Sequence, residues 1–117
     1  MIKSFITYYT NESEINDFIN SIWEEFLKIE LDWKNISCKN DLIKIFCNFL
    51  NIKNIAYNWD FLEEIINDTF WNKYLIIILK NKDSLFFNDE NNENISIFYN
   101  ILIDLISEEK KAIFIKK

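Results

Sequence analysis

The stretch Tyr74-Leu-Ile-Ile-Ile-Leu79 carries six consecutive apolar residues and has the composition of a β-strand. A strand that is apolar at every position has to be covered on both faces, which is typical of parallel sheets with helices packed against them. The segments before and after it show the patterns of further strands and helices. The stretch therefore predicts an α/β fold in which residues 74–79 form a central, buried strand.

The residues before this strand predict one strand and two helices. Residues 29–33 alternate between apolar and acidic side chains, as in a strand with one wet face. Asn40 is the predicted cap of a helix that ends near residue 50, and residues 51–57 break the helical period and predict a loop. Asn58 is the predicted cap of a short helix that runs to about Asp68. The helix after Asn40 is expected to bury Leu42, Ile43, Phe46, Cys47, Phe49 and Leu50.

The residues after the central strand predict a loop, a helix and a last strand. Residues 80–94 are polar, and Leu85-Phe86-Phe87 is expected to pin this loop to the core. Residues 94–108 predict a long, largely apolar helix, and residues 112–115 predict a strand. From residue 29 onward the order is β-α-α-β-loop-α-β. With right-handed crossovers, this order builds a small parallel sheet with helices against it.

The first 27 residues predict an additional strand and helix. Residues 4–9 have strand composition, and Asn11 with Glu14 resembles a capping box. A helix follows this capping box, and we expect it to give way to a strand near Lys28. Its predicted apolar stripe consists of Ile15, Phe18, Ile19, Ile22, Trp23 and Phe26. We therefore expect residues 1–27 to pack as an N-terminal extension on a domain formed by residues 28–117.

The composition excludes most familiar enzyme chemistries. The 117 residues suffice for one core, and half of them are apolar, which excludes the signature of disorder. Gly, His and Arg are absent, which removes Gly-rich phosphate loops, His bases and ligands, and bidentate Arg clamps. We expect no enzyme activity, cofactor or metal. The net charge of −6 argues against a nucleic-acid partner.

The two cysteines bear on the compartment. Cys38 and Cys47 lie nine positions apart on a predicted helix, which separates them by roughly 13 Å and excludes a disulfide. Unpaired thiols, without a secretory pattern before residues 10–14, predict a reducing compartment and thus the cytoplasm. The longest unbroken apolar runs are far shorter than the roughly 18 residues that would span a bilayer. We expect no membrane partner.

Negative charge is concentrated on the helix that follows Asn58. At about 100° per residue, one helix face collects four acids, and like charges one turn apart destabilise a helix. These acids are Asp60, Glu63, Glu64 and Asp68. A solvated face is the simplest interpretation, while a glycosidase-like acid pair or a hard-metal site is a weaker one. Across residues 58–109, eleven acids against three lysines give a local charge of −8, which can steer a basic partner.

The residues Tyr57-Asn58-Trp59-Asp60-Phe61-Leu62 followed by Glu64 resemble the signature helix of the barstar family. The order and spacing of the predicted elements extend the resemblance over residues 28–117. Members of this family are small cytosolic inhibitors of secreted microbial ribonucleases of the barnase type. The resemblance implies a three-stranded parallel sheet flanked by helices, with residues 1–27 as an extra segment. It also implies that an acidic helix and the loop before it plug a basic active site.

The resemblance assigns partner-binding roles to several residues. Asp60 matches the first helix carboxylate of the family, and Glu64 matches the second, which occupies the phosphate site of the enzyme. Asn58 and Trp59 match the junction of loop and helix, and Tyr57 is expected to be an apolar anchor before it. Asp104 matches a further acid on the last helix, and Glu63 and Asp68 share the acidic face. The loop is one residue shorter than in the family and lacks its Gly, and Glu64 replaces an Asp. These differences favour a cognate enzyme other than barnase.

Two hypotheses of different classes follow. The first is an immunity protein or antitoxin, a monomer when free, that inhibits a basic ribonuclease toxin with Tyr57, Trp59 and the acidic helix. The second is a non-inhibitory regulatory module with the same fold, whose contact surface is residues 1–27. An enzyme is the weakest alternative.

Overall fold

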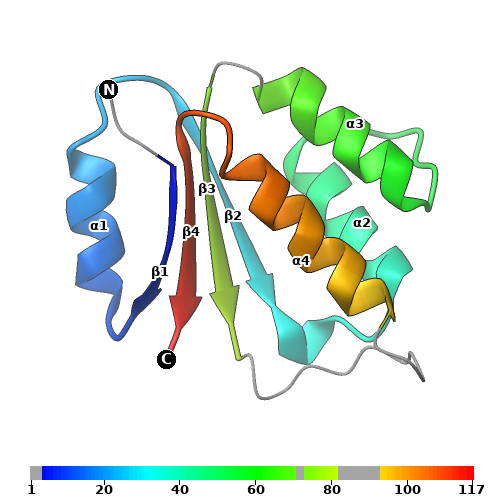
Figure 1. The fold of residues 1–117 in the computed structure, drawn as a ribbon, viewed down its shortest axis with the longest axis horizontal. Coiled ribbons are helices and arrows are strands. Elements are labelled where there is room, and N and C mark those ends of the chain that lie inside the picture. Colours follow the sequence, from blue (N-terminus) through cyan, green and yellow to red (C-terminus); the bar gives the residue numbers. More distant parts are fainter. Residues whose placement is uncertain (1–3, 71–72, 82–92) are drawn as a thin grey trace.

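The computed structural model describes residues 4–70, 73–81 and 93–117, which form an α/β fold with a parallel sheet (Figure 1). Most of the polar loop predicted at 80–94, including Leu85-Phe86-Phe87, lies outside the described residues. The elements are β1 (Phe5–Tyr9), α1 (Glu12–Asn20), β2 (Phe26–Asp32), the 3-10 turn Trp33–Asn35, α2 (Lys39–Phe49), α3 (Trp59–Phe70), β3 (Tyr74–Lys80), α4 (Glu93–Leu105) and β4 (Lys111–Lys116).

The sheet has four strands in the order β1-β4-β3-β2, all parallel, so the expectation of a three-stranded sheet is wrong. The N-terminal strand joins the sheet because its backbone pairs along β4, from Phe5 opposite Ala112 to Tyr9 opposite Lys116. The boundary expected between residues 27 and 28 falls within β2.

Helices cover both faces of the sheet, as the apolar stretch 74–79 predicts. In Figure 1, α1 lies on one face, and α2, α3 and α4 lie on the other. Residues 74–79 are all buried, which confirms their prediction as a central strand. The core between α1 and the sheet contains Tyr9, Ile15, Ile76, Ile78, Ala112 and Phe114. The core under α2–α4 includes Ile29, Leu31, Leu75, Ile77, Leu79 and Ile113 from the strands.

The first helix is shorter than its apolar stripe predicts. It ends at Asn20, where the amides of Ser21 and Ile22 bond the carbonyls of the residues three positions earlier. Phe26 already pairs with Tyr74 in the sheet, so the hydrogen bonds of β2 replace the last predicted helical turn. Trp23 lies between the two elements and is 97% exposed rather than buried.

The second helix begins earlier than predicted. Its N-cap is Cys38, so Asn40 lies within the first turn and is not the cap. The Asp41 carboxylate accepts hydrogen bonds from the backbone amide and the hydroxyl of Ser37, and thereby fixes the start of the helix. Phe49, predicted as buried, lies in the last turn and is 41% exposed.

The last helix ends about one turn before its predicted end. The amide and the hydroxyl of Ser107 both donate hydrogen bonds to the carbonyl of Asp104, at 3.2 Å and 2.5 Å. These bonds form a turn, and the helix does not continue. Glu108 is therefore on the connection to β4 rather than on α4.

Asn51 in the predicted loop has a φ of 59°, which agrees with Asn adopting a left-handed backbone there. Both cysteines are free, and no helix within the described segments is long and apolar enough to cross a membrane.

A lysine lies buried at the start of β4. Lys111 is 1% exposed, and its Nζ donates to the carbonyls of Lys73 and Glu109 at 3.0 Å and 2.8 Å. Burial lowers the pKa of this amine below its ordinary value of 10.5, because removal from water disfavours the charged form. The folded protein therefore binds the Lys111 proton less tightly than the unfolded chain does.

This shift predicts that Lys111 makes the protein more stable as the pH rises from its lowered pKa to 10.5, since the unfolded state then binds more protons. Unfolding free energies of wild type and Lys111→Met, measured by denaturant titration from neutral pH to 10.5, isolate this effect. The wild type should gain stability relative to the variant as the pH increases. Lys44→Met, at an exposed position of α2, is the control. A difference between wild type and Lys111→Met that stays constant with pH would contradict the prediction.

Candidate functional site

The loop before α3 ends in a side-chain cap, as predicted. The Asn58 Oδ1 accepts a hydrogen bond from the amide of Phe61 at 2.8 Å, and the Asn58 carbonyl accepts from Leu62 at 3.3 Å. These bonds satisfy donors that the first helical turn would otherwise leave unpaired. Asn58 is thus engaged within its own chain and sets the direction in which α3 begins.

Loss of this cap should destabilise the protein. Asn58→Ala is expected to lower the free energy of unfolding by about 1 kcal/mol, the usual cost of removing an Asn cap. Chemical denaturation measures the change. Asn54→Ala, in the exposed loop before the helix, is the matched control and should have a smaller effect. Equal losses in the two variants would show that the hydrogen bond to Phe61 does not stabilise α3.

The acidic face of α3 has the geometry that its sequence predicts. Asp60, Glu64 and Asp68 are exposed and Glu63 is half-buried, while the opposite face buries Leu62 and Ile66 at 0% and 1% exposure. Within the described part of the chain, no basic group forms an ion pair with any of these four acids. Uncompensated negative charge therefore runs along the solvent side of the helix.

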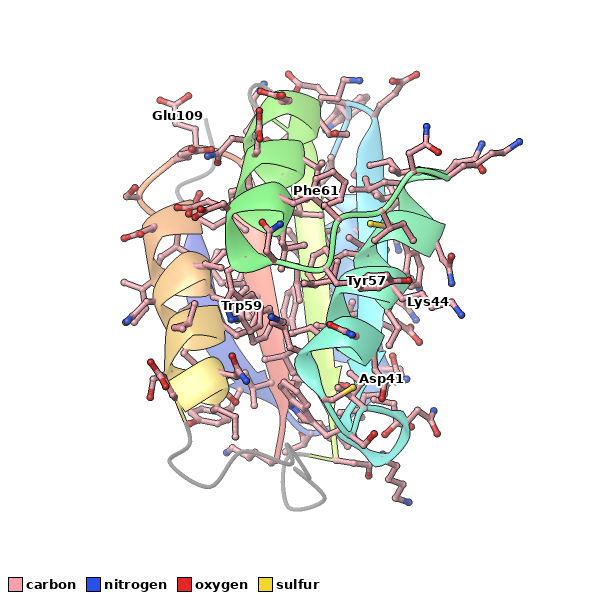
Figure 2. The ribbon with its side chains drawn as sticks, turned by 90° about the vertical axis from the view of Figure 1, so that its right-hand side faces the viewer. Asp41, Lys44, Tyr57, Trp59, Phe61 and Glu109 are labelled. Carbon is pink, nitrogen blue, oxygen red and sulfur yellow. The ribbon has the colours of Figure 1, made fainter. Side chains whose placement is uncertain are left out.

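The two aromatic residues at the start of α3 differ in their surroundings. Trp59 is half-buried; its Nε1 donates to Asn94 Oδ1 at 3.0 Å, and its ring stacks on Phe98 with centroids 6.3 Å apart. Trp59 therefore ties α3 to α4. Tyr57 is 42% exposed and lies toward α2 in Figure 2. Of these two predicted contact residues, Tyr57 offers more of its ring to a partner.

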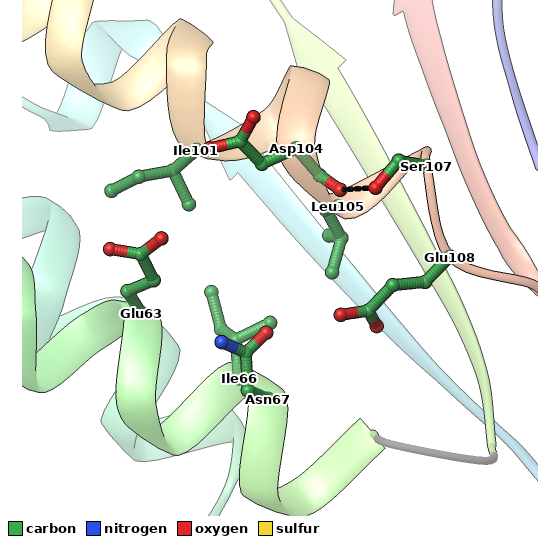
Figure 3. Close-up of a pocket in the computed structure, with 8 residues that line it drawn as sticks. All are labelled: Glu63, Ile66, Asn67, Ile101, Asp104, Leu105, Ser107 and Glu108. Carbon is green, nitrogen blue, oxygen red and sulfur yellow. Dashed lines mark hydrogen bonds between the residues drawn. The ribbon is translucent and has the colours of Figure 1, made fainter.

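Glu63 and Asp104, predicted on different helices, line the same cavity of about 230 Å³ (Figure 3). The cavity lies between α3 and α4, and its wall also contains Glu108, Asn67 and Ser107. Its apolar lining comes from Ile66, Ile101 and Leu105. The structure thus places Glu63 of α3 and Asp104 of α4 in the wall of one cavity. The cavity has three carboxylates and no basic residue in its lining.

Glu108 was not among the predicted site residues. Glu108 was counted among the acids of residues 58–109. The last helix was predicted to extend to residue 108, and this gave no reason to place Glu108 near Glu63. Because α4 ends at Leu105, Glu108 lies in the connection to β4. Its side chain lines the cavity between α3 and α4 (Figure 3). No group of three Asp, Glu or Cys side chains among the described residues is arranged to hold a metal ion.

The remaining predicted residues lie in a strip rather than in one cluster. Tyr57 and Asn58 are at the N-terminal end of α3, and Asp68 is near its other end. At 1.5 Å per residue, Asn58 and Asp68 are separated by roughly 15 Å along the axis. Asp60 and Glu64 lie between them on the exposed face, outside the cavity lining. A partner that contacts all of these residues must follow the length of the helix.

No protein-family model matches the chain, and no curated protein is significantly similar to it in sequence.

Proposed function

We propose that this protein inhibits a basic ribonuclease toxin by placing the acidic face of α3 and the loop before it against the active site of the enzyme. The observation that carries the proposal is the strip formed by Asp60, Glu64 and Asp68, which is exposed and has no basic partner among the described residues. Repulsion between acids one turn apart costs helix stability. A cationic partner would remove that cost and gain charge-assisted contacts.

The overall charge supports the same kind of partner. The chain carries a net charge of −6, and the acidic segment accounts for more than all of it. A field of one sign attracts an oppositely charged protein before contact and raises the association rate. A ribonuclease active site is a suitable target, because an enzyme that binds RNA phosphates presents basic groups there. The resemblance to the barstar family further leads us to assign the phosphate-site contact to Glu64 and the neighbouring contact to Asp60.

In this proposal, Tyr57 supplies the apolar part of the contact with the enzyme. This residue is 42% exposed in the loop that leads into α3, and Tyr is common among residues that dominate binding energy. Trp59 supports the site from within, since its indole is bonded to Asn94 and stacked on Phe98. Glu63, Asp104 and Glu108 add a second region of negative charge on the α4 side.

The test is inhibition of a nuclease by the purified protein. The first candidate partner is the product of the neighbouring open reading frame, assayed by pull-down and by cleavage of a fluorogenic RNA. We expect stoichiometric inhibition by the wild type and its loss in Glu64→Lys. Glu25→Lys, an exposed acid in the turn before β2, makes the same charge change away from α3 and should still inhibit. Equal inhibition by both variants would overturn the assignment of the site.

A regulatory module that binds through residues 1–27 is the alternative function. One observation favours it: Ile6 and Tyr8 of β1 are 39% and 55% exposed. Because β1 belongs to the sheet and Phe26 to β2, deletion of residues 1–27 would remove parts of the fold. The variant Tyr8→Lys is the cleaner test. Loss of partner binding in this variant, with Glu64→Lys unaffected, would favour the alternative.

A further inference from the structure

Trp23 is held outward by its two neighbours in the turn between α1 and β2. Ile22 packs against the core between α1 and the sheet, and its amide donates to the carbonyl of Ile19 at 3.0 Å. Glu24 forms an ion pair with Lys110 at 2.8 Å. Both neighbours are thus anchored, and Trp23 between them is 97% exposed. Trp is enriched among the residues that dominate binding energy, so this exposed side chain needs an explanation.

A cavity of about 250 Å³ adjoins this turn, where β2 and β3 begin, and we refer to it as the β2–β3 cavity. Most of its lining is apolar and comes from the strands and from the end of α2: Phe26, Leu27, Phe49, Leu50 and Tyr74. Glu25, Thr69 and Lys73 complete the lining. An apolar cavity of about 150 Å³ holds benzene, so this larger one has room for the two fused rings of an indole.

We propose that two copies of this chain form a symmetric dimer in which Trp23 of each copy inserts into the β2–β3 cavity of the other. Trp23 precedes Phe26, which lines the cavity, by three positions, so the inserting side chain and its receiving cavity lie on one surface. A two-fold axis through this surface fills both cavities and closes the assembly at two copies. The dimer replaces the free monomer expected from the sequence.

The area that such a contact buries is sufficient for a weak dimer. A buried Trp side chain removes about 150–250 Å² from water, and the wall that receives it loses a similar area. Two reciprocal contacts therefore bury roughly 600–1,000 Å², which reaches the lower limit of specific interfaces. Phe26 and Phe49 are 40% and 41% exposed beside the cavity and add to this area. We expect a dimer that forms at high concentration and dissociates on dilution.

The charged groups of the turn and the cavity lining allow two copies to approach here. Glu24 is already paired with Lys110, whose Nζ also lies 5.5 Å from the centroid of the Tyr74 ring. Glu25 and Lys73 have opposite charges, and neither forms an ion pair in the parts of the chain that the structure describes. These four charges sum to zero, whereas the solvent side of α3 carries only acids. Repulsion between two chains of net charge −6 is therefore weaker at this surface than at α3.

The proposed dimer does not use the acidic strip. Thr69 is the residue of α3 that lines the β2–β3 cavity, and at about 100° per residue it lies on the side of the helix opposite Asp60. Self-association and nuclease inhibition are therefore separate properties. A dimer without inhibitory activity would leave this inference intact and refute the proposed function. An inhibitor that remains a monomer would do the reverse.

Sedimentation equilibrium of the purified full chain tests the oligomeric state. We expect wild type to have twice the monomer mass of 14.3 kDa at high concentration and to dissociate on dilution. Trp23→Ala should be a monomer at every concentration, and its fold should be intact because Trp23 is 97% exposed. Tyr8→Ala removes another aromatic ring, from a residue of β1 that is 55% exposed, and should still form the dimer. A monomeric wild type, an assembly larger than a dimer, or equal association of all three proteins would overturn the proposal.

A second variant tests the cavity independently of the side chain that enters it. Thr69 is half-buried in the cavity lining, so Thr69→Trp places a ring where Trp23 of the other copy would insert. This variant should be a monomer, with circular dichroism to verify its fold. Asn67→Trp adds the same ring to an exposed position of α3 outside this lining and should still form the dimer. A folded Thr69→Trp that dimerises as well as wild type would contradict the insertion of Trp23 into this cavity.

Discussion

Replacement of Glu64 by Ala is expected to weaken binding of a basic nuclease by ~2–5 kcal/mol, and Asp60→Ala by a similar amount. In the free protein Glu64 is exposed and has no ion-pair partner among the described residues, so its removal breaks no ion pair there. In the complex, the same truncation would leave a cationic group of the enzyme buried without its partner. The loss should therefore be confined to binding, where titration calorimetry measures it.

The stability of the free variant distinguishes this explanation from a folding defect. Glu64 lies one turn from both Asp60 and Asp68, so Glu64→Ala should leave the unfolding free energy unchanged or raise it by a few tenths of a kcal/mol. Asp17→Ala removes an exposed acid from α1 and is the control for a general charge effect. Its binding loss should be small and should shrink further at high salt. Wild-type affinity in Glu64→Ala for a confirmed nuclease partner would refute the assigned role.

Replacement of Phe98 by Ala is expected to cost about 3–5 kcal/mol of folding stability, the usual range for a fully buried Phe. Phe98 is 0% exposed and lies among aromatic rings from three other elements of the core. Its ring centroid is 5.9 Å from that of Trp33, 6.3 Å from those of Phe46 and Trp59, and 6.0 Å from that of Tyr99. The cavity left by Phe98→Ala would remove the packing contacts with all of these rings.

The same substitution should weaken partner binding under conditions in which the variant is folded. Phe98 supports Trp59, which ties the start of α3 to α4, so its loss should loosen the acidic strip. Phe49→Ala is the matched control, because Phe49 is 41% exposed and removal of its ring should cost much less stability. Denaturant unfolding measures both variants. A similar loss in the two would mean that the aromatic cluster around Phe98 does not carry the stability assigned to it.

Local patterns predicted the parts of the fold in which one interaction dominates. The apolar stretch 74–79 has one stable environment, a strand covered on both faces, and the structure confirms it. Asn58 caps α3 because its short side chain can reach the amide of Phe61 without help from the rest of the chain. The helical period placed Leu62 and Ile66 inside and the acids outside for the same local reason.

Other features depend on contacts between distant residues and could not be read from the sequence. The hydrogen bonds of Phe26 with β3 override a helical stripe that continues past Asn20. The fourth strand of the sheet arises from pairing between the two ends of the described chain. The cavity that joins Glu63, Asp104 and Glu108 exists only because α3 and α4 pack side by side and α4 ends early.

The position of β4 between β1 and β3 has a consequence for the order of folding. The amide of Lys111 donates to the Ser4 hydroxyl across 107 positions of the sequence. Closing so long a loop costs chain entropy before any contact compensates for it, and such distant pairing slows folding. During synthesis β1 leaves the ribosome well before β4, which then has to insert between two strands already made. We expect the insertion of β4 to be the slow, final step, with β1 and β3 exposed to other chains until it occurs.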